Sequence, residues 1–240
     1  MKAIIPAAGH GTRFLPVTRV VPKEMLPIGA RPALEVIVEE ARAAGADEIV
    51  MVISRGKELI REYFRDDPSM RFVYQEEQRG LGHAVLQAAS AVGAGDSPVL
   101  VLLGDALVAG GNASAELAAV SAAHGGASVI GLERVPREKT SRYGIVEMDG
   151  GRIVDMVEKP SPEEAPSDMA IAGRYLLDAA IFELLATQTP GKGGEIQLTD
   201  AIRRLLAQKP VYGCVYSGKR QDIGSPSGYF AALKAMGENE

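Results

Sequence analysis

Two rhythms of hydrophobic and polar residues alternate along the first half of the chain. Short apolar runs are typical of strands buried on both faces, and between them apolar residues recur every three or four positions, as in helices. Strands are predicted at 3–5, 48–54, 71–74, 98–103 and 127–133, and helices at 34–41, 57–64, 81–90 and 115–123. This order predicts an α/β fold with a doubly wound, mostly parallel, Rossmann-like sheet and helices on both faces.

The rhythm changes after about residue 135. A hairpin is predicted where Gly150-Gly151 joins two strand-like stretches. The strands predicted in this half are 143–148, 152–157, 169–176 and 211–217, and the helices are 179–186, 197–207 and 226–236. We therefore interpret residues 1–240 as one domain, in which about 1–135 form the doubly wound part and about 136–240 a smaller, partly antiparallel lobe.

The first strand leads directly into a loop punctuated by glycines. Gly9 and Gly11 have no Cβ, so backbone N–H groups there can approach and surround an anion. Arg13 and Lys23 add a forked guanidinium and a mobile ammonium, both suited to phosphate. A dinucleotide fingerprint would need glycine in place of Phe14, and no Gly-Lys-Ser/Thr follows as in a Walker loop. The loop is predicted to bind phosphate in another way, with a plain turn as the alternative.

Composition narrows the function classes. Hydrophobic content of 46% with 24% charged residues is ordinary for a globular protein. The net charge of −5 argues against a nucleic-acid partner, which needs a basic face. No apolar run approaches the ~20 residues of a membrane span, and the apolar N-terminus is too short for a signal peptide. We expect a cytoplasmic protein without a membrane partner. The single cysteine, Cys214, excludes a disulfide framework or Cys-rich metal site.

Two aspartates occupy positions suited to a metal ion. Asp105 follows the covered strand at 98–103, at the end where an α/β sheet binds its ligands, and Asp222 lies near the end of the second lobe. Mg²⁺ is commonly held by one or two carboxylates together with substrate phosphates. The pair is therefore a candidate Mg²⁺ site, and a capping role is the alternative for either residue.

Other polar residues stand at the ends of predicted elements. Glu158 and Lys159 end a strand and could bind sugar hydroxyls and a phosphate, or form a surface ion pair. Gln75 and Gly80 precede a helix and could contact the edge of a pyrimidine, or simply begin that helix. His83 lies in the helix start, which favours a structural role. No Ser-His-Asp, Cys-His or HExxH arrangement is present.

Together these motifs resemble those of bacterial UTP–glucose-1-phosphate uridylyltransferases, within the sugar-phosphate nucleotidyltransferase superfamily. The matching stretches are AAGHGTRFLP, PKEMLP, GLGHAVLQA, EKPSPEEAPSDMAIAGRYLL, GGEIQLTDAI and QDIGSPSGY. With the apolar strand before them, they cover residues 3 to about 230. The resemblance implies Mg²⁺-dependent transfer of a uridylyl group from UTP to glucose 1-phosphate, giving UDP-glucose and pyrophosphate.

The resemblance also implies roles for single residues. Those expected to bind the nucleotide are Ala7, Ala8, Gly9, Gly11, Thr12, Glu24, Gln75 and Gly80. The cations expected to act on phosphates in catalysis are Arg13, Lys23 and Lys159. The residues expected to contact the sugar, in a sugar-binding lobe, are Gly144, Glu158 and Gly173. The expected Mg²⁺ ligands are Asp105 and Asp222.

The sequence departs from the family pattern in three places. The segment Arg55–Tyr74 is short, the C-terminal tail is short, and Gly104 stands before Asp105 where the family often has proline. Gly-Asp is found in thymidylyltransferases, so a thymidylyl- or cytidylyltransferase stays open, as does a non-catalytic nucleotide-sugar sensor. The Gln75 amide could by itself turn to suit uracil or cytosine. Assembly into a homo-oligomer is also open.

Overall fold

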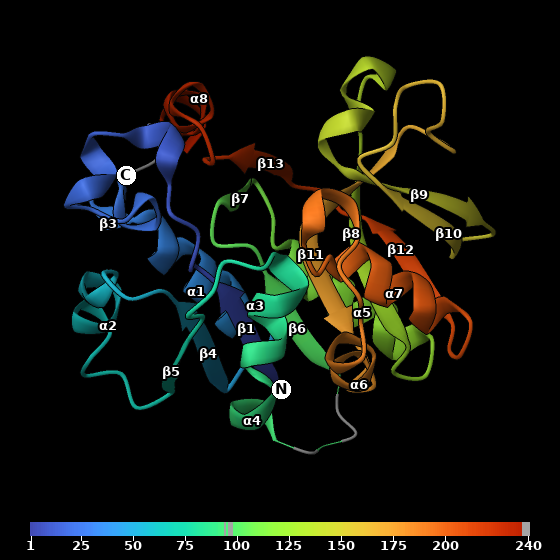
Figure 1. Ribbon diagram of the computed structural model, residues 1–240, viewed down its shortest axis with the longest axis horizontal. Coiled ribbons are helices and arrows are strands. Elements are labelled where there is room, and N and C mark those ends of the chain that lie inside the picture. Colours follow the sequence, from blue (N-terminus) through green and yellow to red (C-terminus); the bar gives the residue numbers. More distant parts are fainter. Residues whose placement is uncertain (94, 96–97, 237–240) are drawn as a thin grey trace.

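A central mixed sheet organises the computed structural model, which describes residues 1–93, 95 and 98–236. Within these residues the sheet has nine strands in the order β5-β4-β1-β6-β11-β8-β12-β10-β9 (Figure 1). The strands are β1 Lys2–Pro6, β4 Glu48–Ile53, β5 Met70–Tyr74, β6 Val99–Leu102, β8 Ser128–Arg134, β9 Gly144–Asp149, β10 Arg152–Glu158, β11 Met169–Leu177 and β12 Val211–Val215.

Helices cover both faces of this sheet, as predicted. The helices are α1 Ala33–Ala43, α2 Glu58–Tyr63, α3 Leu81–Gln87, α4 Ala89–Val92, α5 Ala113–Ala123, α6 Ile181–Ala186, α7 Leu198–Leu206 and α8 Pro226–Met236. Side chains alternate along β1, so Ile5 packs in the core beneath α1 and α5, while Ile4 packs in the core beneath α3, α6 and α7. The last helix begins where Ser225 Oγ accepts a hydrogen bond from Gly228 N, 3.2 Å away.

Strand β11 gives the sheet its mixed character. The strands β5, β4, β1 and β6 pair in parallel, and so do β8 and β12. By contrast, β11 lies antiparallel between β6 and β8, and all nine of its residues are buried. Residues 169–177, which the change of rhythm placed in the second lobe, thus form a central strand of the main sheet.

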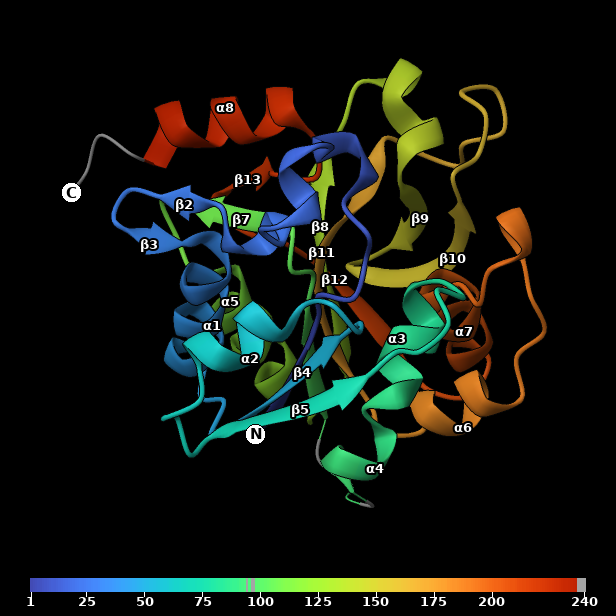
Figure 2. The ribbon, with the colours of Figure 1, turned by 60° about the vertical axis from the view of Figure 1, so that its left-hand side comes forward.

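The predicted hairpin forms from β9 and β10; β10 pairs with β12 and β9 with β11 (Figure 1). Two short strand pairs were not predicted: β2 Pro27–Ile28 with β3 Arg31–Pro32, and β7 Ala106–Ala109 with β13 Lys219–Asp222. The second pair matters most, because it brings the chain just after Asp105 beside Asp222. In Figure 2, β7 and β13 lie side by side beneath α8.

A buried ion pair connects three of these elements. Arg174 on β11 is fully buried, and its Nε and Nη2 lie 2.8 and 2.7 Å from the two carboxylate oxygens of Glu40 on α1. Arg174 also donates to the carbonyl oxygens of Ala106 (2.6 Å) and Gly173 (3.1 Å). Burial alone would raise the pKa of Glu40, but the attraction of Arg174 and hydrogen bonds from Ser114 outweigh it and lower that pKa.

We predict that Glu40→Ala lowers the free energy of unfolding by ~3–5 kcal/mol, because it leaves a buried guanidinium without its counter-charge. Asp155→Ala is the control: its partner Arg203 is 58% exposed, and the loss should be below ~1 kcal/mol. Urea unfolding above pH 6 measures both. Because the pKa of Glu40 is lowered in the folded protein, the stability that its charge contributes is lost as the pH falls through that pKa. The larger loss in Glu40→Ala than in Asp155→Ala should therefore disappear over the same pH range. Equal losses in the two variants would contradict the prediction.

Candidate active site

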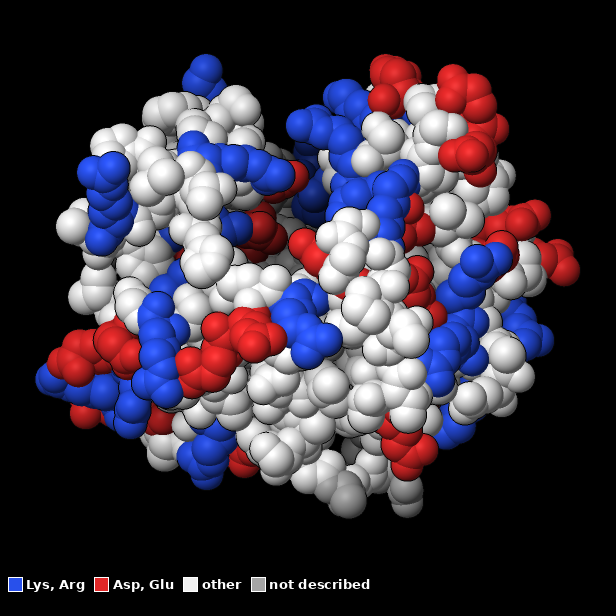
Figure 3. Space-filling view, in the orientation of Figure 1, with Lys and Arg blue, Asp and Glu red and all other residues white. Residues whose placement is uncertain are grey.

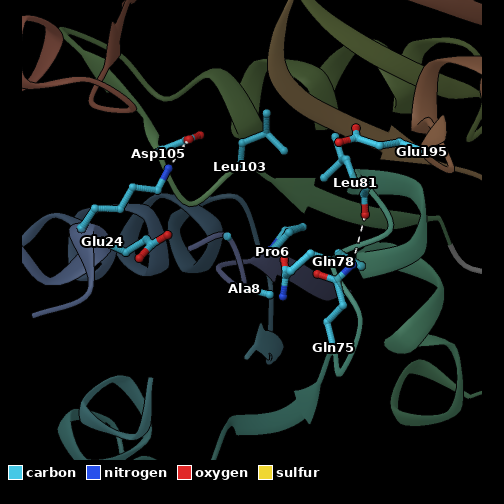
Figure 4. A pocket seen from close by; sticks show the side chains of 13 residues that line it. Pro6, Ala8, Glu24, Gln75, Gln78, Leu81, Leu103, Asp105 and Glu195 are labelled. Carbon is cyan, nitrogen blue, oxygen red and sulfur yellow. Dashed lines mark hydrogen bonds and ion pairs between the residues drawn. The ribbon is translucent and has the colours of Figure 1, made fainter. Parts of the chain in front are cut away.

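A cavity opens at the carboxyl ends of β1, β5 and β6 and encloses about 330 Å³. The predicted site residues that line it are Ala8, Gly9, Lys23, Glu24, Gln75, Gly80 and Asp105. Gln78, Leu81 and Glu195 also line it, and Figure 4 shows their side chains around the same space. We call this the first cavity. It lies where an α/β sheet binds ligands.

A second cavity, of about 460 Å³, lies beyond Asp222. It is lined by Arg13, Ser141, Arg142, Tyr143, Lys159, Asp222, Ser225 and Ser227. Figure 3 shows a hollow on this face, between the region of α8 with the N-terminal loop and that of the β9–β10 hairpin, with basic and acidic side chains around it. The structure therefore divides the predicted phosphate-binding cations: Lys23 lies in the first cavity, and Arg13 and Lys159 in the second.

Asp105 and Asp222 lie together between the two cavities. Ile223 N donates to the carbonyl oxygen of Asp105 at 2.9 Å, which fixes the two chain segments against each other. A Cβ placed on Gly224 would lie 3.2 Å from Asp105 Oδ2 and 3.0 Å from Asp222 Oδ1. Both carboxylates are thus within reach of one cation. Gly224 also accepts a hydrogen bond from Arg13 at 3.3 Å, which places that guanidinium at the same point.

Lys23 faces this pair of carboxylates. Its Nζ lies 2.5 Å from Asp105 Oδ2. Burial opposes the charge on Lys23, but the attraction of Asp105, Glu24 and Asp222 outweighs burial and raises its pKa. For Asp105 burial acts in the opposite direction, and the charge and hydrogen bond of Lys23 outweigh it and lower the pKa of the carboxyl. Both groups therefore stay charged at neutral pH.

Glu24 is also paired, through a residue that sequence reasoning missed. Lys57 lies at the start of α2, is 7% exposed, and its Nζ lies 2.8 and 3.0 Å from the Glu24 carboxylate oxygens. It also donates to the carbonyl oxygen of Ala7 at 2.6 Å. Burial lowers the pKa of Lys57, with Glu24 opposing that shift. The position of Lys57 after the apolar run 48–53 was a usable signal, since ligands gather at that strand end.

The Gly-Leu-Gly motif lets two distant segments touch. Gly80, with φ of 101°, and Gly82 would each bring a Cβ within 3 Å of the carbonyl oxygen of Ile196. That carbonyl accepts from Gly82 N at 2.8 Å, and Ile196 N donates to Arg79 O at 2.7 Å. Only glycine allows this approach without displacement. The contact places Glu195 on the wall of the first cavity.

Two of the three predicted sugar-binding residues lie together on the hairpin side. Glu158 and Gly144 are opposite one another in the β9–β10 register. The Glu158 carboxylate accepts from Thr199 Oγ1 at 2.7 Å and lies 2.9 Å from Lys159 Nζ. Gly173 lies apart from this cluster, in the β11 bulge, where its carbonyl accepts from Leu103 N at 3.0 Å.

The remaining predicted residues support the loop without lining either cavity. Ala7 is buried, the Gly11 carbonyl accepts from Thr18 Oγ1 at 2.9 Å, and Thr12 is exposed at the start of the first 3-10 turn.

Arg220, beside Asp222, was not predicted from the sequence. It ion-pairs with Glu133 at 2.5 Å, lies 3.6 Å from Asp222 Oδ2, and packs over the Tyr143 ring. Its place two residues before Asp222, on the same strand face, was the available signal.

The sequence profile of the family described as nucleotidyl transferase matches residues 2–239. The chain belongs to the nucleotidyl transferase family. Members of this family generally use a divalent metal ion. Within residues 1–93, 95 and 98–236 no group of three or more His, Cys, Asp or Glu could hold one. Among the same residues, no helix is long and apolar enough to cross a membrane.

Relatives of this nucleotidyl transferase agree in their names. The UTP–glucose-1-phosphate uridylyltransferase YngB of Bacillus subtilis (strain 168) is 40% identical over 267 residues, spanning 98% of this chain and 89% of the relative. UTP–glucose-1-phosphate uridylyltransferase 2 of Staphylococcus saprophyticus is 42% identical over 258 residues, spanning 95% and 89%. A crystal structure of a UDP-glucose pyrophosphorylase complexed with UDP-glucose matches with a TM-score of 0.91 and 36% identity, over 100% of this chain and 99% of that one. The family, fold class and enzyme class predicted from the motifs are confirmed.

We predict that Lys57→Met lowers the free energy of unfolding of this nucleotidyl transferase by ~3–5 kcal/mol, because Glu24 would be left as an unpaired buried carboxylate. The double variant with Glu24→Gln should recover part of that loss, since no charge then stays buried. Lys209→Met is the control, because Lys209 is 48% exposed and pairs only at the surface with Asp178. Denaturant unfolding measures all three. A double variant no more stable than Lys57→Met would refute the pairing argument.

Proposed function

We propose that this nucleotidyl transferase transfers the uridylyl group of UTP to glucose 1-phosphate, forming UDP-glucose and releasing pyrophosphate. The observation that carries the proposal is the pair Asp105 and Asp222, which lies between a cavity able to hold a base and a second cavity lined by three cationic side chains, those of Arg13, Arg142 and Lys159. The names of the relatives support this pair of substrates.

The first cavity is proposed to hold the nucleotide. Gln75, Gly80 and Glu24 would surround the uracil, the backbone of Ala8 and Gly9 would contact the nucleotide, and Lys23 would hold the triphosphate. Arg13 is proposed to contact the triphosphate from the second cavity. Ala7, Gly11 and Thr12 would act through the backbone shape of the loop, because they do not line the cavity.

The second cavity and the hairpin cluster are proposed to hold the sugar phosphate. Lys159 would bind the phosphate of glucose 1-phosphate, and Glu158 would accept hydrogen bonds from sugar hydroxyls. Gly144 and Gly173 would allow close approach of the backbone to the sugar. A Cβ on Gly144 would lie 3.3 Å from Glu158 Oε2 and would narrow the space around that carboxylate.

Asp105 and Asp222 fit a Mg²⁺ ion, because two carboxylates completed by phosphate oxygens are a usual Mg²⁺ environment. Bound there, the ion would neutralise charge on the reacting phosphate oxygens. The Lys23 ammonium forms an ion pair with Asp105 Oδ2, and a bound triphosphate would offer this ammonium an alternative partner. Mg²⁺ itself is part of the proposal.

The reaction needs no general base. A phosphate oxygen of glucose 1-phosphate is already anionic and forms a bond to the α-phosphorus of UTP, while the bond from that phosphorus to the oxygen bridging to the β-phosphate breaks. Pyrophosphate leaves with that oxygen, and no proton must move. The contribution of Arg13, Lys23 and Lys159 is to hold the two anions in line and to stabilise their charge.

Pyrophosphate release from a panel of nucleotides crossed with sugar phosphates tests the proposal. UTP with glucose 1-phosphate should give the highest kcat/KM. A dTTP value equal to that of UTP would instead support a thymidylyltransferase, and nucleotide binding without pyrophosphate release would support a sensor. The predicted cytoplasmic location and homo-oligomer are separate expectations that this assay leaves untouched.

We predict that Asp105→Asn and Asp222→Asn each reduce kcat at least ~100-fold while the fold survives, because each removes one carboxylate from the metal site. Asp168→Asn, in an exposed pair with Arg134, is the matched control and should turn over normally. Steady-state rates at limiting Mg²⁺, with circular dichroism to check the fold, give the comparison. Near-normal turnover of Asp222→Asn at limiting Mg²⁺ would remove it from the site.

We predict that Lys159→Ala and Glu158→Gln act on the sugar phosphate and leave the nucleotide KM within about twofold. Lys159→Ala should cost ~1.5–3 kcal/mol of kcat/KM for glucose 1-phosphate, the range of a hydrogen bond to a charged group. Glu158→Gln should mainly raise the KM of the sugar phosphate. If Glu158→Gln left discrimination among sugar phosphates unchanged, the two residues would be only a surface ion pair.

A further inference from the structure

The Gln75 side chain is held by two acceptors at once. It is 3% exposed, and its Nε2 lies 3.2 Å from the carbonyl oxygen of Gly80 and 3.1 Å from Nδ1 of His83. Figure 4 shows Gln75 directed into the first cavity, with the bond to Gly80 dashed. A carbonyl oxygen only accepts, so the amide must turn its nitrogen toward Gly80.

The same geometry assigns the protonation of His83. Since Gln75 Nε2 donates one hydrogen to Gly80 and the other to the ring, Nδ1 must carry the lone pair and Nε2 the proton. Gln87 Nε2 lies 3.2 Å from His83 Nε2. Because two N–H donors cannot bond to each other, this tautomer of His83 requires the Gln87 amide to be turned so that its oxygen accepts the ring proton. Burial and the nearby charge of Arg79 lower the pKa of His83, against the opposing effect of Glu77, which favours the neutral ring.

With both amide hydrogens used, Gln75 presents only an acceptor to a ligand. No hydrogen bond to its Oε1 is made by the residues that the structure describes, and the side chain lines the first cavity. A uracil ring offers an N3–H donor, whereas N3 of cytosine is an acceptor. To suit cytosine the amide would have to rotate, which would turn its oxygen toward both Gly80 O and His83 Nδ1.

We propose that His83 is a positioning residue for nucleotide specificity: together with the Gly80 carbonyl it fixes Gln75 as an acceptor and so favours UTP over CTP. The inference deepens the proposed function and rests on the base lying against Gln75. An acceptor at Gln75 does not distinguish uracil from thymine, because both bases carry N3–H. His83 itself does not touch the reacting atoms.

The test is the ratio of kcat/KM for UTP to that for CTP, at fixed glucose 1-phosphate and Mg²⁺. In His83→Leu the amide loses one of its two acceptors, so the ratio should fall about fivefold to tenfold, the effect of one hydrogen bond. In His83→Gln the new amide oxygen can take the position that Nδ1 of His83 occupies, so this variant should restore most of the ratio. His124→Leu, a histidine at the end of α5, should leave it unchanged. The ratio is independent of the folded fraction, because both substrates meet the same preparation.

An unchanged ratio in His83→Leu would overturn the inference. So would equal losses in His83→Leu and His124→Leu, because the effect would then be unrelated to Gln75. Gln75→Leu separates this failure from failure of the proposed function. If Gln75→Leu lowers the ratio and His83→Leu does not, only the role of His83 is wrong. If Gln75→Leu leaves kcat/KM unchanged for both UTP and CTP, the base does not lie against Gln75.

Discussion

One buried guanidinium fixes the geometry on which the site depends. Arg174 crosses from the central strand to Glu40 on the first helix and, on the way, holds the Ala106 carbonyl. Asp105 directly precedes that carbonyl, so the loop carrying a proposed metal ligand is fixed by a cation in the protein core. An apolar residue at 174 would withdraw a donor from Ala106 and leave Glu40 buried without a counter-charge. The sheet, the helix layer and the site therefore share one electrostatic connection.

The charges of the first cavity balance one another before any ligand arrives. Lys57 is held by Glu24, and Lys23 by Asp105. Glu24 and Lys57 are buried and Lys23 and Asp105 partly so, and the attraction within each pair offsets the cost of removing these charges from water. The pairing also links two binding events, because a phosphate that attracts Lys23 would release Asp105 for a cation. Anion and cation would each favour the binding of the other at equilibrium.

Local hydrophobic patterns predicted most helices and strands, but they do not show which distant segments pair. The hydrophobic rhythm located β1, β4, β5, β6, β8 and the β9–β10 hairpin, because burial on two faces or one leaves a period in the sequence. A run such as 169–177 shows that it is buried but not which neighbours bury it, so its antiparallel place between β6 and β8 was missed. Family motifs contain part of the lining of each cavity, such as Lys23 and Asp105 in the first and Arg13 and Asp222 in the second. Lys57 was missed because a single lysine at a helix start is usually solvated.

The strand order also determines which strands lack a neighbour while the ribosome is still synthesising this chain. The four parallel strands β5, β4, β1 and β6 are complete once residue 102 has been made, but β8 ends at residue 134 and its neighbours β11 and β12 begin only at residues 169 and 211. An apolar strand without neighbours is a template for pairing with other chains. Nascent chains on one messenger therefore carry open edges on β6 and β8 throughout this interval, when binding by a chaperone protects them most.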